Sequence, residues 1–330
     1  MNLAIIGATG LVGREIIKVI EELNLDITNC YLSASENSVG KTLKVKGETL
    51  KVLKIDDVLK EKIDIAIFSA GTEVSKYYAP KFVEKNAFVI DNSSQWRLYE
   101  KVPLVVPEIN SHLISEETKL IANPNCSTIQ LVLVLYPLHK TYKIRRIVIS
   151  TYQSVSGSGY KAIEQLMAER NGLSNYTKFY PHKIDMNCIP FAGSLTENKY
   201  STEEMKLINE TKKILNDYSL KITSTVVRIP IINCHSESVN IEFFNTYELN
   251  DIYNILKNSP GIVLIDEPEN NFYPMPIIAA GRNEVFVGRI RRDFSIENGL
   301  NLWIVADNLR KGAATNAVQI ALYIKNKFNL

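Results

Sequence analysis

The chain has 330 residues, of which 45% are hydrophobic and 22% charged, with a formal net charge of +2. This composition is typical of a globular protein of two domains, and the near-neutral charge argues against nucleic acid or an anionic membrane as a partner. No apolar run reaches the roughly 18 residues needed to span a membrane, and no signal peptide is recognisable. The four cysteines and four histidines are scattered, so we expect a cytoplasmic protein without a metal site.

A glycine-rich turn follows the first expected strand, at residues 2–6. Gly7, Gly10 and Gly13 form a G-x-x-G-x-x-G pattern at the start of a helix that should reach about residue 23. Glycines at these positions let backbone N–H groups approach a pyrophosphate, although the usual pattern is G-x-G-x-x-G. The turn therefore predicts a dinucleotide site, with a purely structural glycine-rich turn as the alternative.

Strands and helices then alternate along the first third of the chain. Strands are expected at 30–34, 63–69 and 87–91, and a helix is expected at about 72–86. This alternation predicts a Rossmann-type, doubly wound parallel sheet that binds ligands at the carboxyl ends of its strands. The segment 35–41 lies where the adenosine ribose of a dinucleotide is expected.

The hexapeptide Asn-Pro-Asn-Cys-Ser-Thr, at residues 123–128, joins an apolar strand to an apolar helix. Asn and Pro favour a tight turn, so the helix should begin at Cys126. The helix dipole and the unpaired N–H groups of a first turn favour thiolate over thiol, and thiolate is the nucleophile. The alternative for a lone cysteine is a buried structural residue.

The pattern changes after Arg146, where strands no longer alternate regularly with helices. The strands expected here, at 147–152, 221–229, 238–244, 261–265, 285–292 and 300–306, suggest an α+β domain with a mostly antiparallel sheet. Helices are expected at 159–170, 203–215 and 308–328, and a buried insertion at 186–190. We therefore expect a dinucleotide-binding domain made of 1–127 with the last helix, 308–330, and a catalytic and dimerisation domain made of 128–307.

Motifs spread along the whole chain occur in one order that resembles the bacterial-type aspartate-β-semialdehyde dehydrogenases. They lie at 7–13, 91–94, 105–110, 123–128, 150–157, 203–206, 210–215, 228–230, 235–239, 273–276 and 307–309. The resemblance implies NADPH-dependent reductive dephosphorylation of L-aspartyl 4-phosphate to L-aspartate 4-semialdehyde and phosphate. This reaction belongs to the biosynthesis of lysine, through diaminopimelate, and of threonine and methionine.

Three residues would carry the chemistry if the resemblance holds. Cys126 would hold the acyl group as a thioester while hydride arrives. His235 would be the acid/base, because its ordinary pKa near 6.5 allows proton exchange at neutral pH. Gln153 would orient the acyl group. A structural histidine is the alternative for His235.

Five further residues would bind the substrate and phosphate. Arg228 would grip the substrate α-carboxylate, for which a planar guanidinium is well suited. Glu203 would pair the substrate ammonium, and Lys206, one helical turn on, would bind phosphate together with Arg97 and Asn92. An ordinary i,i+3 surface pair is the alternative for Glu203 and Lys206.

The resemblance also implies cofactor contacts from both domains. The expected residues are Gly7, Thr9, Gly10, Leu11, Val12, Asn37, Ser38, Ser156, Gly157 and Asn308. We expect NADP as the cofactor. NAD is possible because Asn37 stands where NADP-using relatives usually place an arginine, and a carboxylate at Glu36 would repel a 2′-phosphate.

Two alternative functions stay open at this point. N-acetyl-glutamyl-phosphate reductases share the chemistry, but Glu203 suits a free ammonium better than an acetylated amine. A non-catalytic paralogue that acts as a binding or scaffold protein is the other. The resemblance further implies a homodimer or homotetramer. Cys234 precedes His235 where glycine is common, and a disulfide between Cys234 and Cys126 is a conceivable oxidative off-switch.

Overall fold

A computed structural model describes residues 1–330, which form two compact units. The first unit consists of Met1–Asn125 and Ala313–Leu330, and the second of Cys126–Gly312. None of the helices is both long and apolar enough to cross a membrane.

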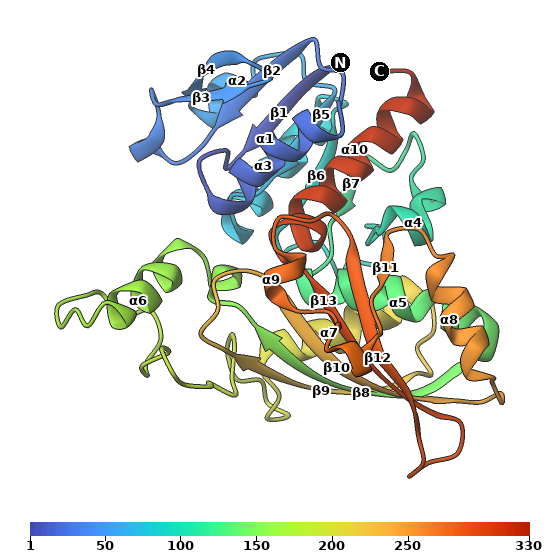
Figure 1. The fold of residues 1–330 in the computed structure, drawn as a ribbon. Helices are drawn as coiled ribbons and strands as arrows, with labels where there is room; N and C mark the ends of the chain where they lie inside the picture. Colours follow the sequence, from blue (N-terminus) through green and yellow to red (C-terminus); the bar gives the residue numbers. More distant parts are fainter. The chain divides into compact units, whose positions relative to one another are not determined.

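The first unit is built on a seven-stranded sheet in the order β3-β4-β2-β1-β5-β6-β7 (Figure 1). All neighbouring strands are parallel except β3 and β4, which form an antiparallel hairpin. The strand bounds are β1 (Asn2–Ile6), β2 (Asn29–Ser33), β3 (Thr42–Val45), β4 (Glu48–Leu53), β5 (Ile65–Phe68), β6 (Phe88–Asp91) and β7 (Leu120–Ala122). The Rossmann-type parallel sheet expected from the sequence is confirmed.

Helices cover both faces of this sheet because its strands are apolar on both sides. Helix α1 (Leu11–Glu22) and the C-terminal helix α10 (Thr315–Phe328) pack on one face, against residues such as Leu3 and Ile5. Helices α2 (Ile55–Val58) and α3 (Thr72–Glu84) pack on the other. The short helix α4 (Pro107–Asn110) also belongs to this unit. The last helix, α10, thus belongs to the first unit.

The hairpin of β3 and β4 was missed by the sequence analysis. Most of its side chains are exposed, so its apolar pattern is weak. Lys46 and Gly47, at the tip, both have positive φ (49° and 84°), as a two-residue hairpin turn requires.

The second unit is built on a six-stranded sheet in the order β11-β12-β13-β10-β8-β9. The β8–β10, β10–β13 and β12–β13 pairs are antiparallel, whereas β8–β9 and β11–β12 are parallel. The bounds are β8 (Ile144–Gln153), β9 (Lys221–Arg228), β10 (His235–Phe243), β11 (Ile262–Leu264), β12 (Val285–Asp293) and β13 (Gly299–Ala306). The mostly antiparallel sheet of the sequence analysis is confirmed.

The helices of the second unit are α5 (Cys126–Tyr142), α6 (Tyr160–Arg170), α7 (Thr202–Leu215), α8 (Leu249–Lys257) and α9 (Pro276–Ala279), shown in Figure 1. Helix α5 begins at Cys126, as predicted. The long C-terminal helix is instead divided, since a π-helical turn, Arg310–Ala314, precedes α10. The expected buried insertion at 186–190 is wrong: Met186 is 91% exposed and only Ile189 is buried. The segment forms no helix or strand that would direct its apolar side chains to one buried face. Its apolar composition therefore did not lead to burial.

Candidate active site

Three candidate residues stand side by side at the ends of three neighbouring strands in the second unit. Gln153 ends β8, and the register pairs it with His235 at the start of β10 and with Arg228 at the end of β9. All three side chains are buried. The strand register therefore brings together residues that lie up to 82 positions apart in the sequence.

The first turn of α5 is tied to this row at two points. The Gln153 amide Nε2 donates to Ser127 Oγ at 2.8 Å, and Gln130 Nε2 donates to the His235 carbonyl oxygen at 3.3 Å. Gly312 also approaches the turn so closely that a Cβ there would lie 2.9 Å from the Cys126 Cβ. Cys126 thus starts a helix that is anchored beside Gln153 and His235, where the helix dipole favours thiolate.

His235 is fully buried and held by the neighbouring Ser154. The Ser154 backbone N–H donates to His235 Nδ1 at 3.1 Å, which places the ring proton of the neutral imidazole on Nε2. Nε2 has no hydrogen-bond partner in the structure. Burial, and then the positive charge of Arg228, lower the pKa of His235 to about 3. The pKa of His235 therefore departs from the ordinary value assumed from the sequence. The ring is neutral, and its Nε2 N–H can donate a hydrogen bond.

The turn after β8 packs against both His235 and Arg228. A Cβ at Gly157 would lie 2.8 Å from Arg228 Nη1 and 3.0 Å from His235 Nε2. Arg228 Nη1 itself donates to the Ser154 carbonyl oxygen at 2.9 Å. A side chain at Gly157 would therefore displace Arg228 and His235 from this packing.

A second set of hydrogen bonds fixes the loop before β10. Asn308 Oδ1 accepts from the Cys234 N–H at 2.9 Å and from Ser154 Oγ at 3.0 Å, while Asn308 Nδ2 donates to Ser156 Oγ at 3.0 Å. Asn308 and Ser156, both expected to contact the cofactor, are buried and engaged with each other.

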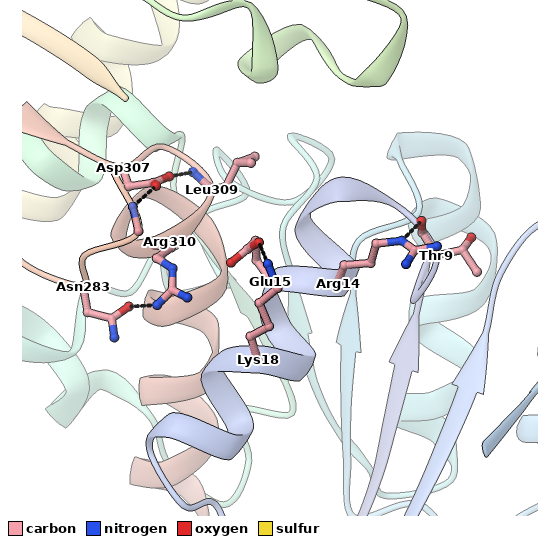
Figure 2. A network of polar contacts seen from close by, with 9 residues as sticks. Thr9, Arg14, Glu15, Lys18, Asn283, Asp307, Leu309 and Arg310 are labelled. Atoms are coloured by element: carbon pink, nitrogen blue, oxygen red, sulfur yellow. Dashed lines mark hydrogen bonds and ion pairs between the residues drawn. The ribbon is translucent and has the colours of Figure 1, made fainter. Parts of the chain in front are cut away.

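The residues around Asn308 are held by a polar network of the second unit (Figure 2). Asp307 Oδ1 accepts from the Leu309 N–H at 2.9 Å, and its other oxygen accepts from the Gly281 N–H at 2.8 Å. The Arg310 guanidinium donates to Asn283 at 3.4 Å. These contacts hold the backbone that carries Asn308.

A cavity of about 740 Å³ opens beside the row, within the second unit. Arg228, Glu203 and Gly157 line it, together with apolar and aromatic side chains such as Phe179 and Phe191. A guanidinium and a carboxylate in one cavity suit a ligand that carries both a negative and a positive group.

Glu203 and Lys206 lie one turn apart on α7, and Lys206 Nζ donates to Glu203 Oε1. The i,i+3 pairing kept as an alternative in the sequence analysis is thus present. Both side chains are partly buried, with 14% of Glu203 and 28% of Lys206 exposed, so the pair is not an ordinary solvated one.

Asn92 and Arg97 lie together in the first unit. The Arg97 guanidinium donates to the Asn92 carbonyl oxygen at 2.8 Å, and Asn92 Oδ1 accepts from Asn123 Nδ2 at 2.8 Å. The turn at Asn123 is itself fixed by Asn316 of α10, whose Nδ2 donates to Asn123 Oδ1 at 2.7 Å. The segment just before Cys126 is therefore rigidly positioned in its unit.

A second cavity, of about 360 Å³, lies at the carboxyl ends of β1, β2 and β5 in the first unit. Gly7, Thr9 and Gly10 line it, whereas the expected contacts Leu11, Val12, Asn37 and Ser38 do not. Its other lining residues include Glu36, Lys54, Asp56 and Tyr78, and of these Lys54, Asp56 and Tyr78 were not predicted.

The glycine-rich turn shows why a dinucleotide fits this cavity. Gly7 has φ 93°, and a Cβ there would lie 2.2 Å from the Ser69 carbonyl oxygen. A Cβ at Gly13 would lie 2.2 Å from the Gly7 carbonyl oxygen, so α1 packs directly on the turn. Arg14 Nε donates to the Thr9 carbonyl oxygen at 3.1 Å and braces the loop (Figure 2). Helix α1 thereby begins at the cavity, with Gly10 before its first residue, and a helix N-terminus is a geometry that binds phosphates.

Cys234 adopts the left-handed conformation, with φ 73°, which a glycine would adopt without strain. Its thiol is buried among Ile265, Phe286 and other apolar side chains and lies 3.4 Å from the Pro276 carbonyl oxygen. Burial raises the pKa of this thiol. A low thiolate fraction and this engagement make Cys234 a poor disulfide partner, so the structure gives no support to the proposed off-switch.

Several residues that build the site were not predicted from the sequence. Ser154, Ser127, Gln130 and Gly312 contact His235, Gln153 or Cys126 directly. Ser127 and Ser154 lie within recognised motifs and Gln130 lies two residues after one, so their neighbourhood was a usable signal. Gly312 carried no signal, because its role depends on a close approach that only the fold creates.

Comparison with known proteins places the chain in one family. The model described as semialdehyde dehydrogenase, NAD binding domain, matches residues 2–117, and the model described as semialdehyde dehydrogenase, dimerisation domain, matches residues 135–311. The chain is 50% identical to an aspartate-semialdehyde dehydrogenase of Aquifex aeolicus, covering 97% of this chain and 96% of the relative. It is 44% identical to that of Bacillus subtilis, covering 100% and 99%.

A solved structure extends the similarity to the fold. The crystal structure of aspartate semialdehyde dehydrogenase II complexed with ASA, from Vibrio cholerae, superposes with a TM-score of 0.95 at 40% identity. The match covers 99% of this chain and 98% of that one. With these matches over nearly its whole length, the chain belongs to the aspartate-semialdehyde dehydrogenase family.

Proposed function

We propose that the protein reduces L-aspartyl 4-phosphate to L-aspartate 4-semialdehyde and phosphate with NADPH, in the biosynthesis of lysine, threonine and methionine. The observation that carries the proposal is the row of Arg228, Gln153 and His235 tied to the helix that begins at Cys126. The row brings a carboxylate-binding cation, an amide and a proton donor to the start of a cysteine-bearing helix.

Cys126 is the proposed nucleophile. Its thiolate attacks the acyl carbon, the carbon–oxygen bond to phosphate breaks, and phosphate leaves as the thioester forms. The Gln153 amide, which donates to Ser127 Oγ, orients the acyl group. NADPH, when bound in the first unit, supplies the hydride that reduces the thioester.

His235 is the proposed proton donor when the thioester is reduced. Reduction places negative charge on the former carbonyl oxygen, and the N–H of His235 Nε2 can protonate or stabilise it. The Ser154 N–H on Nδ1 keeps the ring in the tautomer that this step needs. Collapse of the hemithioacetal then releases the aldehyde and restores the Cys126 thiolate, and the alcohol proton returns to His235.

The proposed substrate contacts follow from the charges that line the larger cavity. Arg228 pairs the α-carboxylate and Glu203 the ammonium of the aspartyl group. Lys206 in the second unit, with Arg97 and Asn92 in the first, are the proposed phosphate ligands. Before substrate binds, Glu203 and Lys206 neutralise each other as an ion pair. The substrate ammonium then takes the place of Lys206 beside Glu203, and the phosphate takes the place of Glu203 beside Lys206.

NADP is the proposed cofactor, bound at the glycine-rich turn of the first unit. Gly7, Thr9 and Gly10 line its cavity, and Lys54 is the cation there that can attract a 2′-phosphate. Glu36 lines the same cavity and repels that phosphate, so NAD is the alternative cofactor. Leu11, Val12, Asn37, Ser38, Ser156, Gly157 and Asn308 remain proposed contacts.

A cytoplasmic homodimer or homotetramer is the proposed form of the enzyme, and the match to a family dimerisation domain supports oligomer formation. The alternative substrate, N-acetyl-glutamyl phosphate, lacks the free ammonium that Glu203 suits. A non-catalytic scaffold role would leave the row of buried polar side chains, Gln153, Arg228 and His235, without a purpose.

The test is the reduction of NADP⁺ and of NAD⁺ by aspartate semialdehyde, with and without phosphate, for the wild type and Cys126→Ser. We expect phosphate-dependent reduction that the variant loses. Equal activity in the variant would refute Cys126 as the nucleophile. No activity with either coenzyme would refute the proposed reaction, and N-acetyl-glutamate semialdehyde would then be the next substrate to assay.

A further inference from the structure

Glu237 is a fully buried carboxyl group that the proposed reaction does not use. It lies on β10 two residues after His235, so both side chains point to the same face of the sheet. The register places Thr151 of β8 opposite it on one side and Ile304 of β13 on the other. Glu237 therefore forms the layer directly behind the row of Gln153 and His235.

The surroundings of Glu237 offer no positive charge. Both carboxyl oxygens lack a hydrogen-bond partner in the structure, and so do Thr151 Oγ1 and Gln130 Oε1. Burial raises the pKa of Glu237 well above its ordinary value, opposed only by the side chain of Gln130 on α5. No lysine, arginine or other charged side chain contributes to that pKa.

An ionised carboxylate is costly in such a place. Burial of an unpaired charge costs several kcal/mol, whereas a neutral acid needs only ordinary hydrogen bonds. The neutral form also adds one O–H donor to a cluster in which Gln130 Oε1 and Thr151 Oγ1 are acceptors without partners. Its protonation would thus satisfy one of these two buried oxygens.

We propose that Glu237 is an un-ionised carboxylic acid at neutral pH and, through Gln130, positions His235 and the first turn of α5. Gln130 is the link, because its Nε2 already donates to the His235 carbonyl oxygen. The O–H of the protonated acid can donate to Gln130 Oε1, which has no partner in the structure, and would so orient that amide. Glu237 is a positioning residue, not a catalytic one.

Neutrality also matters for His235. A negative charge two residues away on the same face would favour the imidazolium and oppose the neutral ring described above. The un-ionised acid supplies a hydrogen bond without that charge. The charge state of Glu237 can be tested whether or not the proposed function is correct. The effect of Glu237 on turnover, by contrast, rests on the proposed function.

The direct test is infrared difference spectroscopy of the full-length protein at neutral pH, comparing wild type with Glu237→Gln. We expect a carbonyl stretch of an un-ionised carboxylic acid in the wild type that the variant lacks. Glu242→Gln is the matched control, because Glu242 lies on the same strand but is ionically paired with Arg145 and should give no such band. Absence of the band in the wild type would overturn the proposal.

Stability against pH gives a second, independent test. The folded pKa of Glu237 lies above the unfolded value near 4.5, so the folded state keeps a proton that the unfolded state releases. The contribution of Glu237 is complete below that value and is lost as pH rises towards the folded pKa. Glu237→Gln should therefore gain in melting temperature over the wild type as pH rises from about 5 to 8. A pH-independent difference would contradict the proposal.

Kinetics separate positioning from mere packing. Glu237→Gln keeps a neutral hydrogen-bonding group and should retain kcat within about threefold with an unchanged pH profile, whereas Glu237→Leu should lose about 10- to 100-fold in kcat with little change in KM. An equal loss in both variants, or no loss in Glu237→Leu, would refute the positioning role. If Glu237→Leu does not fold, the pH profile of kcat in Glu237→Gln provides the test. A shifted profile would show that the substitution removed a charge, and would refute the un-ionised state of Glu237.

Discussion

The candidate sites of the two units are built from different groups, one mainly from backbone and the other from buried side chains. The glycine-rich site of the first unit presents backbone around a cavity, and it depends on side chains being absent at Gly7 and Gly13. The row of Arg228, Gln153 and His235 in the second unit consists of buried side chains that hydrogen-bond to neighbouring side chains and backbone groups. The first site should therefore tolerate most side-chain changes on its rim, whereas the second should be damaged by nearly any change.

The contrast follows from what each site binds. A pyrophosphate is large, flexible and satisfied by backbone N–H groups, so side chains there mainly adjust preference. The acyl-transfer step needs a donor and a nucleophile held at fixed positions, where displacement by an ångström is costly. Substitutions can test this contrast.

The largest loss is expected for His235→Asn, which removes the proposed proton donor but keeps a polar side chain. We expect kcat to fall by about 10²- to 10⁴-fold, while KM for the coenzyme stays near the wild-type value. Steady-state kinetics with aspartate semialdehyde and phosphate provide the measurement. A loss below about threefold would contradict the role of His235.

Gly157→Ala should come next. Its Cβ would lie 2.8 Å from Arg228 Nη1 and 3.0 Å from His235 Nε2, so both side chains must shift. Because a displacement of about 1 Å can cost roughly 10²-fold, we expect a fall in kcat of that order with an intact fold. Circular dichroism and kinetics of the variant together check this, and unchanged kcat would show that the row is more adaptable than described.

The pH dependence of stability tests the buried, neutral state of His235. Its folded pKa, about 3, lies below the unfolded value of 6.5, so the unfolded state binds more protons between these values. Stability should fall as pH drops through this window. His235→Asn should lose less stability than the wild type there, as measured by urea unfolding at several pH values. If the stabilities of wild type and His235→Asn changed in parallel with pH, the pKa of His235 would lie near its ordinary value.

In the first unit, Gly7→Ala should act on stability and coenzyme binding rather than on the chemical step. A Cβ at φ 93°, 2.2 Å from the Ser69 carbonyl oxygen, should destabilise the fold by about 1–3 kcal/mol and weaken NADP binding. Gly10→Ala is the control for stability, since its Cβ would lie 3.4 Å from the nearest atom. Equal destabilisation by both variants would contradict the tight turn.

The smallest effect is expected at the rim of the cavity. Glu36→Gln removes a negative charge and should raise the preference for NADP over NAD about fivefold, which corresponds to about 1 kcal/mol for an exposed charge. Glu48→Gln, exposed in the same unit and away from the cavity, should leave the ratio unchanged. An unchanged ratio in Glu36→Gln would show that Glu36 does not face the 2′-phosphate.

The fold class was predictable because strands of the first unit are apolar on both faces and alternate with helices. The start of α5 was predictable too, since Asn-Pro-Asn can hardly continue a helix. The β3–β4 hairpin escaped prediction because its side chains are largely exposed. Met186 was misjudged because an apolar composition does not make a buried segment when no regular element supports it.

The candidate residues were found by motif, but their relations came only from the structure. Strand register aligned Arg228, Gln153 and His235, which no spacing in the sequence reveals. The lowered pKa of His235 and the neighbourhood of Glu237 depend on burial, which the sequence does not state. Local chemistry is readable from sequence, whereas desolvation is a property of the packed molecule.

A thioester on Cys126 should be detectable after mixing the enzyme with aspartate semialdehyde and NADP⁺ without phosphate. Hydride transfer should then produce about one NADPH per active site and stop, because no phosphate is present to release the acyl group. Mass spectrometry should find the acyl group on the peptide that contains Cys126, and Cys126→Ser should show neither burst nor adduct. Steady turnover with phosphate but no burst and no adduct would contradict the account.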